Sequence, residues 1–213
     1  HRGRLVVVAA FEFLDVDPAF ALEADVDDDH AVLDGGHGAL DHAAFEAAVG
    51  GTAVGGHLLR RIAEAFPLMK RAEPALRMIL VTGPRLPASA FAPQPGLEVR
   101  EYVHNLFEHL ACCDLALVQG GLSTCMELVA LRRRFLSFPL ASHFEQCVHV
   151  RRRLQNYCAD CAVDARSLAP AELARRALEA LHAPVDYRPV EVDGARRAAQ
   201  HIAQVLENRY WVR

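Results

Sequence analysis

The chain has 213 residues, of which 52% are hydrophobic, a size and composition typical of one globular domain or one domain with an appendage. No apolar run approaches the roughly 20 residues that a membrane-spanning helix needs, and the stretch at residues 5–14 lacks the cleavage site of a signal peptide. We therefore expect a cytoplasmic protein with reduced cysteines. The C-x-x-C at residues 158–161 has no second pair, which disfavours a metal or redox role.

Charge divides the chain into two parts. Residues 1–59 hold 2 basic and 11 acidic side chains, a net charge of −9, whereas residues 60–213 hold 21 and 16, a net charge of +5. Residues 11–44 show no sustained period of 2 or 3.6. Their acid run at residues 27–29 is more typical of a solvated face than of a metal site. We predict that residues 1–44 form an irregular acidic extension, either disordered or unrelated to the rest.

Regular patterns begin near residue 45, where short apolar runs alternate with stretches that have apolar residues at helical spacing. Strands are predicted within 44–51, 76–84, 97–103, 114–121 and 134–140, and helices at 57–72, 105–113, 123–134 and 147–157, followed by a helical tail ending near Asn208. Apolar strands without alternation are typical of a parallel sheet covered on both faces. The predicted fold class is therefore α/β, a Rossmann-like parallel sheet flanked by helices over residues 45–207, with a tail at 208–213.

Two of the predicted strand-to-helix turns are rich in glycine, at residues 50–56 and 120–124. At the carboxyl ends of parallel strands, such turns bring backbone N–H groups and the positive end of a helix to an anion. Ser123 and Thr124 either cap the following helix or donate to the same anion. Neither turn matches a P-loop or dinucleotide motif, but two in one small sheet favour a nucleotide diphosphate.

Glu127 lies four residues after Ser123, one turn further along the predicted helix. A carboxylate at this place suits the paired hydroxyls of a ribose better than it suits a phosphate. The alternative is an acid that only complements the helix dipole. The spacing alone leaves both interpretations open.

Four motifs occur in order: GGTAVGGHLL, LVTGP, EYVHNLFEHLACCDLALVQGGLSTCMEL and FPLASHFEQ. Together they resemble the C-terminal, nucleotide-sugar-binding half of the GT-B glycosyltransferases, specifically family 28, which includes the MurG-type N-acetylglucosaminyltransferases. The resemblance covers residues 45–207. It implies transfer of a hexose from a UDP-sugar, of the UDP-GlcNAc type, with inversion at the anomeric carbon and with neither a metal nor another cofactor.

The resemblance also implies a role for each matching residue. The first glycine turn, at Gly50, Gly51 and Thr52, approaches the diphosphate. Tyr102 and Val103, after the third strand of the domain, hold the base of the nucleotide. Glu127 binds the ribose, and the polar pair Gln146 and Cys147 contacts the donor sugar. Cys147 departs from the usual amide, which leaves the identity of the sugar open. The predicted nucleotide-sugar site comprises Gly50, Gly51, Thr52, Tyr102, Val103, Gln119, Gly120, Gly121, Ser123, Thr124, Glu127, His143, Glu145 and Gln146.

A GT-B enzyme has a second, N-terminal domain that holds the acceptor and normally the general base, and residues 1–44 do not resemble it. We therefore assign no catalytic residue and expect an acceptor domain or a partner chain. The alternatives are a nonhydrolysing sugar-nucleotide epimerase and a catalytically silent nucleotide-sugar-binding remnant. Arginine runs at 132–134 and 151–153 suit either solvent or peripheral contact with the inner face of a membrane. No nucleic-acid motif accompanies them.

Overall fold

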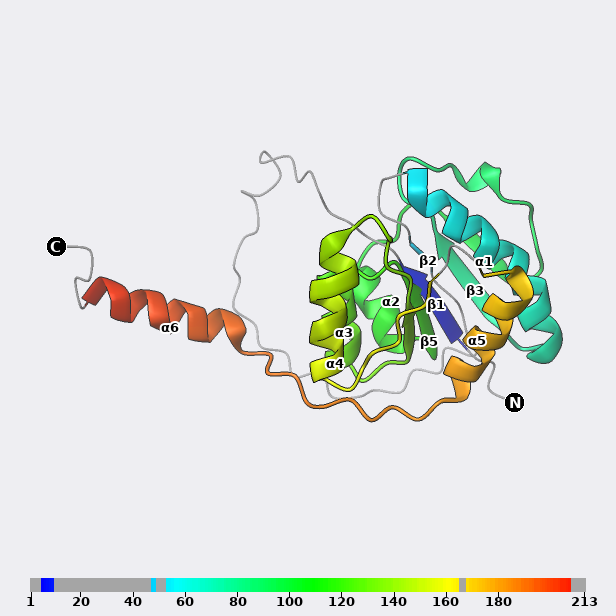
Figure 1. Cartoon of the computed structure of the whole chain (residues 1–213). Helices are drawn as coiled ribbons and strands as arrows, with labels where there is room; N and C mark the ends of the chain where they lie inside the picture. Colours follow the sequence, from blue (N-terminus) through cyan, green and yellow to red (C-terminus); the bar gives the residue numbers. More distant parts are fainter. Residues whose placement is uncertain (1–4, 10–46, 49–52, 165–167, 208–213) are drawn as a thin grey trace, which may run out of the picture.

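A parallel β-sheet organises the fold (Figure 1). The computed structural model describes residues 5–9, 47–48, 53–164 and 168–207. Strands β3, β1, β5 and β6 lie side by side in this order, β4 pairs with β3, and the two-residue β2 pairs with the end of β3. The strands are β1 (Leu5–Ala9), β2 (Ala47–Ala48), β3 (Arg77–Val81), β4 (Leu97–Arg100), β5 (Leu115–Val118) and β6 (Phe135–Ser137).

Helices cover both faces of the sheet (Figure 1). One face carries α1 (Ala53–Ala72) and α5 (Pro170–His182), which pack against each other. The other face carries α2 (Leu106–Cys112), α3 (Leu122–Ala130), the π-helical segment η3 (Glu145–Val150) and α4 (Arg151–Asn156). A short 3₁₀ turn, η2 (Ala88–Ala90), lies in the proline-rich loop.

The apolar strands face two hydrophobic cores at once. Met78 and Leu80 of β3 pack under α1 and α5, whereas Ile79 and Val81 pack under α2 and α3. Successive strand residues point to opposite faces of a sheet, so a strand that is covered on both sides has no polar face. The continuous apolar runs of the sequence follow from this arrangement, and the predicted α/β fold class is confirmed.

Helix α1 contains a proline, Pro67, in its C-terminal half. A proline has no N–H, so the carbonyl of Ala63, four residues earlier, loses its helical donor. The side chain of Gln94 fills this place, since its Nε2 donates to the Ala63 carbonyl oxygen over 3.1 Å. The proline-rich loop thereby holds the helix that forms the largest part of one core.

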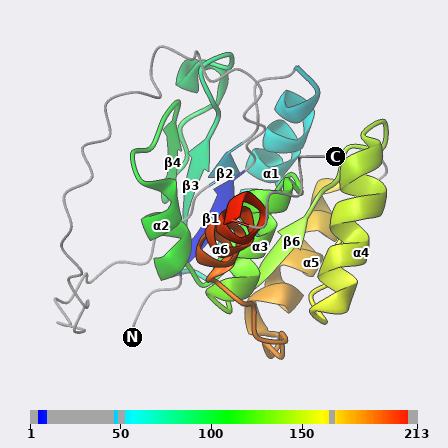
Figure 2. The same ribbon diagram turned by 90° about the vertical axis from the view of Figure 1, so that its left-hand side faces the viewer.

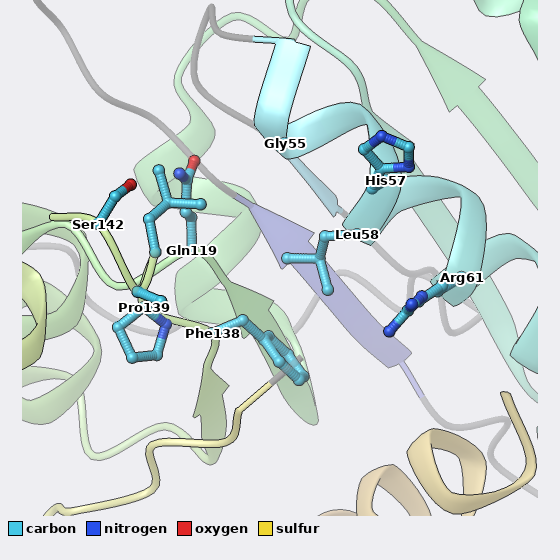
Figure 3. A pocket seen from close by; sticks show the side chains of 10 residues that line it. Gly55, His57, Leu58, Arg61, Gln119, Phe138, Pro139 and Ser142 are labelled. Atoms are coloured by element: carbon cyan, nitrogen blue, oxygen red, sulfur yellow. The ribbon is translucent and has the colours of Figure 1, made fainter. Parts of the chain in front are cut away.

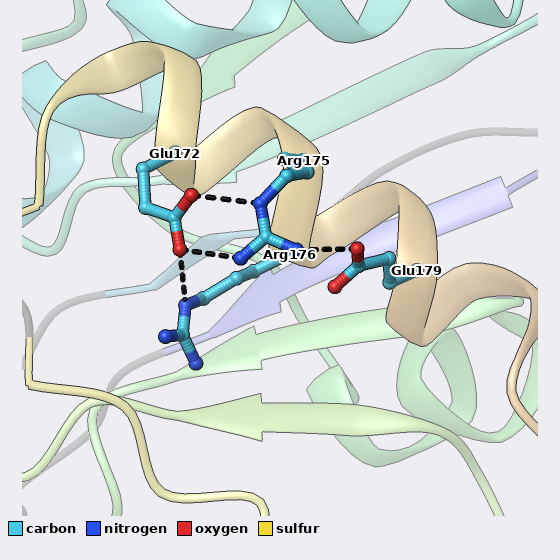
Figure 4. A network of polar contacts seen from close by, with 4 residues as sticks. All are labelled: Glu172, Arg175, Arg176 and Glu179. Carbon is cyan, nitrogen blue, oxygen red and sulfur yellow. Dashed lines mark hydrogen bonds and ion pairs between the residues drawn. The ribbon is translucent and has the colours of Figure 1, made fainter.

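A network of exposed charges runs along α5 (Figure 4). Arg175 donates to both oxygens of Glu172, from Nε over 2.7 Å and from Nη2 over 2.5 Å, and also contacts Glu179. Arg176 Nε donates to Glu172 over 2.9 Å. The hydrogen bonds from Arg175 and then Arg176 lower the pKa of Glu172 to about 2. These charges face solvent, whereas Leu173 and three other buried residues of α5 hold the helix on the sheet.

The N-terminal residues differ from the sequence prediction. Leu5–Ala9 form strand β1, between β3 and β5, so the prediction of an irregular segment over residues 1–44 is wrong for this stretch. The physical reason is that a five-residue apolar run becomes a central strand once its partners on both sides are present, although they lie far away in the chain. Residues 10–44 are outside the described part of the chain.

Two further boundaries differ near the C-terminus. The predicted loop over 141–146 ends early, because η3 begins at Glu145. The predicted helical tail is divided into α5 and α6 (Gly194–Glu207) by a segment without regular structure. Helix α6 has no buried residue and extends away from the sheet (Figure 1). Figure 2 views this helix end-on, in front of the sheet.

The place of β1 gives a testable prediction. Val7 pairs with Ile79 of β3 and Ala116 of β5, so proline at this position removes a ladder donor in mid-sheet. We expect Val7→Pro to lower the free energy of unfolding by roughly 3 kcal/mol or more, measured by urea denaturation. Val192→Pro, in the exposed segment before α6, is the matched control and should change it by about 0.5 kcal/mol or less. Equal midpoints for Val7→Pro and wild type would show that β1 does not belong to the sheet.

Candidate functional site

The segments that follow β4, β5 and β6 enclose a pocket of about 630 Å³ at the carboxyl edge of the sheet. In a parallel sheet this edge is the usual place for a ligand, because loops leave the strands and helices begin there. We call it the carboxyl-edge pocket. It is lined by Tyr102, Val103, Asn105, Leu106, Phe107, Gly121, Leu122, Ser123, Thr124, Glu127, His143, Glu145 and Gln146.

The turn between β5 and α3 presents backbone donors to this pocket. Gly120 has a φ of 104°, a left-handed conformation that favours glycine. Gly121 is the N-cap residue of α3, and no described side chain caps the helix at this position. The first amide that bonds back into the helix is that of Cys125, which donates to the Gly121 carbonyl over 3.1 Å. The amides before it have no acceptor within the helix or among the described residues, so they can donate to a ligand.

Glu127 adds a carboxylate to the same wall. The residue is half-buried, and burial raises the pKa of its carboxyl above the ordinary value of 4.5. Within the described chain its side chain makes no hydrogen bond or ion pair. Because α3 begins at Leu122, Glu127 lies beyond the first turn, where the helix dipole acts most strongly. Hydroxyl groups of a ligand could donate hydrogen bonds to this partly desolvated carboxylate.

The segment after β4 supplies aromatic rings. The side chain of Tyr102 is 68% exposed and that of Phe107 is 49% exposed, whereas Val103 is buried in the core under α2 and α3. Exposed rings beside a pocket can stack on a planar ligand. The chain then turns through Asn105, which has a φ of 53°, into α2.

The third wall is the start of the helical segment η3. Gln146 is buried, and its Oε1 accepts the amide of Leu140 over 2.9 Å. Cys147 donates its thiol to the Leu140 carbonyl over 3.1 Å. The backbone N–H and C=O of Leu140 are therefore both hydrogen-bonded to side chains of η3, and these bonds fix the loop after β6 against η3. A π-helical segment such as η3 is rare and frequently lies at a functional site.

Residues 48–205 match the glycosyltransferase family 28 C-terminal domain. The chain belongs to this family. An uncharacterized glycosyltransferase of Methanopyrus kandleri is 33% identical to the chain over 117 residues, which are 53% of this chain and 32% of that protein. The chain thus matches about a third of the length of its relative. The predicted resemblance to family 28 is confirmed.

The chain is also similar to solved structures at low sequence identity. The UDP-GlcNAc 2-epimerase of Methanocaldococcus jannaschii, in complex with UDP-GlcNAc and UDP, has a TM-score of 0.52 and 12% identity. The match covers 68% of this chain and 40% of that one. The MurG protein of Acinetobacter baumannii has a TM-score of 0.48 and 15% identity, over 68% of this chain and 46% of that one. The matched region is therefore less than half of either protein.

The structure brings most of the predicted family 28 site residues together. Tyr102, Val103, Gly121, Ser123, Thr124, Glu127, His143, Glu145 and Gln146 line the carboxyl-edge pocket. Gly50, Gly51 and Thr52 lie outside the described residues. Gly120 shapes the turn, while Gln119 lines a second cavity, the α1 cavity, which lies between residues 55–61 of α1 and residues 138–142 after β6 (Figure 3).

Sequence reasoning missed four residues of the carboxyl-edge pocket, namely Asn105, Leu106, Phe107 and Leu122. They come from the first residues of α2 and α3 and from the turn before α2. The signal that would have found them is position, since any residue that opens a helix after a parallel strand lies at the carboxyl edge.

Within the described residues no group of three or more His, Cys, Asp or Glu side chains is placed to hold a metal ion. The acidic stretch at residues 27–30 lies outside that part of the chain. None of the described helices is both long and apolar enough to cross a membrane. The predicted peripheral contact with a membrane stays a prediction.

Gly120 offers a test of the β5–α3 turn. A side chain at its left-handed φ is strained, so we expect Gly120→Ala to lower the free energy of unfolding by about 1–3 kcal/mol. Gly194→Ala is the matched control. Gly194 opens α6 with nothing near its Cβ position, and alanine there should be neutral or stabilising by up to about 1 kcal/mol. Urea denaturation measures the free energy of unfolding of both variants. Equal changes for Gly120→Ala and Gly194→Ala would show that the turn does not require glycine at position 120.

Proposed function

We propose that this chain is the donor-binding half of a hexosyltransferase that uses a UDP-sugar of the UDP-GlcNAc type, without a metal and with inversion. The observation that carries the proposal is the carboxyl-edge pocket, where helix N–H groups lie beside the carboxylate of Glu127 and neither has a partner among the described residues. Membership of family 28 supports the transfer of a sugar. The pocket supports the nucleotide, because it offers separate surfaces for a ring, a diol and an anion.

Each part of a UDP-sugar has a matching surface in the pocket. The base stacks on the exposed ring of Tyr102 and bonds to the backbone near Val103. The ribose hydroxyls donate to Glu127, an acceptor that lacks a partner in the described chain. The diphosphate lies at the start of α3, where the amides after Gly121 and the exposed hydroxyl of Ser123 donate to it. The sugar then extends toward the loop after β6.

The chemistry of transfer places negative charge on the leaving UDP. As the bond from the anomeric carbon to the β-phosphate oxygen breaks, that oxygen takes the electron pair. The amides of α3 are already oriented before this charge develops, so they stabilise it without reorganisation. In the proposal these donors replace a metal. An acceptor hydroxyl attacks the opposite face of the sugar, and a general base on the acceptor domain takes its proton.

A complete enzyme needs more than this chain supplies. The described residues form one sheet with its two layers of helices, and the relative from Methanopyrus kandleri is about three times as long as the match. We therefore propose that an acceptor domain or a partner chain closes over the carboxyl edge. The nonhydrolysing epimerase and the silent binding module remain the competing functions, and the next experiment separates them.

Titration calorimetry with EDTA present should show binding of UDP and UDP-GlcNAc with dissociation constants in the micromolar to low-millimolar range. Binding that disappears with EDTA would contradict a metal-free site. Equal affinity for UDP and TDP would contradict the assignment of the nucleotide base to the region of Tyr102. Conversion of UDP-GlcNAc to another sugar nucleotide without an acceptor would show an epimerase. Binding without transfer, even after the acceptor half has been added, would show a silent module.

Glu127→Ala should weaken binding of UDP-glucose about ten- to a hundredfold, the range expected for a hydrogen bond to a charged group. Wild type should bind 2′,3′-dideoxy-UDP-glucose as weakly as the variant binds UDP-glucose. A variant that discriminates between these two ligands as strongly as wild type does would show that Glu127 does not bind the ribose.

The raised pKa of Glu127 adds a pH dependence. An acid whose pKa is raised by folding adds stability at low pH, and this contribution is lost as the pH rises through the folded-state pKa. The unliganded Glu127→Gln variant should therefore be more stable than wild type at neutral pH. Ligand affinity has the opposite trend, since only the carboxylate accepts both ribose hydroxyls. For wild type it should fall as the pH drops through a value above 4.5, and for Glu127→Gln it should stay flat.

A further inference from the structure

The loop after β6 borders both cavities of the domain. It leaves the sheet at Phe138, whose amide donates to the Val118 carbonyl over 2.8 Å. The next residue, Pro139, has no amide to donate. Residues 138–142 form one wall of the α1 cavity (Figure 3), and His143 lines the carboxyl-edge pocket. The position of this short loop therefore shapes both spaces.

Three hydrogen bonds hold the loop at Leu140. The Leu140 amide donates to Oε1 of Gln146 over 2.9 Å. The Leu140 carbonyl accepts the thiol of Cys147 over 3.1 Å and the amide of His143 over 2.9 Å. Two of these three partners are side chains, and both belong to η3. We call the bonds from Gln146 and Cys147 to this residue the Leu140 clamp.

The helical geometry of η3 turns both side chains toward the loop. A π-helical turn closes its hydrogen bond over five residues instead of four, so it holds more residues and successive side chains diverge by a smaller angle. Gln146 is 3% exposed and Cys147 is partly buried. Glu145 and Val148, on either side of the pair, are exposed. Two consecutive residues can therefore bond to the N–H and the C=O of the same loop residue.

We infer that Gln146 and Cys147 are positioning residues, which hold the loop in the conformation that admits the hexosyl part of the donor and do not bind the sugar themselves. This role differs from the direct contact that the resemblance to family 28 implies for the pair. Oε1 of the buried Gln146 and the thiol of Cys147 already have Leu140 as a partner before any ligand binds. The inference rests on the proposed function, in which the sugar of the donor extends toward this loop.

The clamp acts through the population of one loop conformation. Because only the clamped loop admits the sugar, the apparent dissociation constant is the intrinsic one divided by the clamped fraction. One neutral hydrogen bond changes such an equilibrium by a factor of about three to ten. Loss of either bond should therefore weaken the binding of every UDP-hexose by the same factor. The affinity for UDP, which lacks the sugar, should stay nearly unchanged.

Calorimetric titration of the full chain with UDP, UDP-glucose and UDP-galactose tests this role. Gln146→Met, which lacks the acceptor, and Cys147→Ala should each bind both UDP-hexoses about three- to tenfold more weakly than wild type. The ratio between the two sugars, which differ only in configuration at C4, should not change. Cys147→Ser keeps a hydrogen donor and should restore the affinity of wild type. Gln200→Met on α6 and Cys112→Ala on α2 are matched controls at exposed positions and should bind like wild type.

Hydrogen exchange at the Leu140 amide, followed by NMR, tests the clamp without a ligand. The exchange should be about three- to tenfold faster in Gln146→Met than in wild type, because the variant removes the acceptor of this amide. In Gln200→Met it should keep the rate of wild type. An equal rate in Gln146→Met and wild type would show that the bond to Gln146 does not hold the loop.

Two results of the titrations would overturn the inference alone. A changed ratio between UDP-glucose and UDP-galactose in Gln146→Met or Cys147→Ala would show direct contact with the sugar. Unchanged affinities together with a lower melting temperature would show that the pair only stabilises the fold. In both cases, binding of UDP by wild type would uphold the nucleotide site. If wild type binds neither UDP nor a UDP-hexose, the proposed function fails and this inference fails with it.

Discussion

All paired strands of the sheet run parallel, and this constraint places every ligand-facing group at one edge of the molecule. Parallel strands end at the same edge, and each helix that follows them begins there with free amides. Strands β5 and β6 end at the same height in the sheet, because their last residues, Val118 and Ser137, pair with each other. The loops after these strands therefore start side by side. The carboxyl-edge pocket and the α1 cavity lie on two sides of this one junction.

Backbone conformation at the junction explains the glycine that lies there. A Cβ at Gly120 would meet Pro139 Cα at 3.5 Å, an ordinary contact, so the requirement for glycine comes from its φ and not from lack of space. Gln119 continues the alternation of β5, in which Leu115 and Leu117 face the core under α1, and it lines the α1 cavity. Gly121 follows the left-handed turn at Gly120 and lines the carboxyl-edge pocket.

The sequence predicted the buried strands well, because a strand that is covered on both faces has an unbroken apolar pattern. It did not predict β1, since pairing in a parallel sheet is non-local and an acidic stretch follows Leu5–Ala9. Motif order found most of the carboxyl-edge pocket, but no motif shows which way a turn residue points. Gln119 continues the alternation of Leu115 and Leu117 in β5, but the face of β5 that packs against α1 depends on tertiary packing, which a motif does not record.

The arginine run at residues 132–134 shows a similar limit. Composition suggested solvent or a membrane surface, yet Arg134 Nε donates to the Ala183 carbonyl over 2.6 Å and Arg132 Nη1 to the Tyr187 carbonyl over 2.8 Å. These bonds attach the segment after α5 to the end of α3, so part of the run is structural. Gln146 and Gln94 also each form a hydrogen bond with a backbone group of another segment. The Glu127 carboxylate and the Gln119 amide have no such bond within the described chain, and a desolvated polar group without a partner lowers the stability of the unliganded protein. A fold only about 5–15 kcal/mol more stable than its unfolded chain tolerates few such groups, which favours an interpretation in which a ligand supplies their partners.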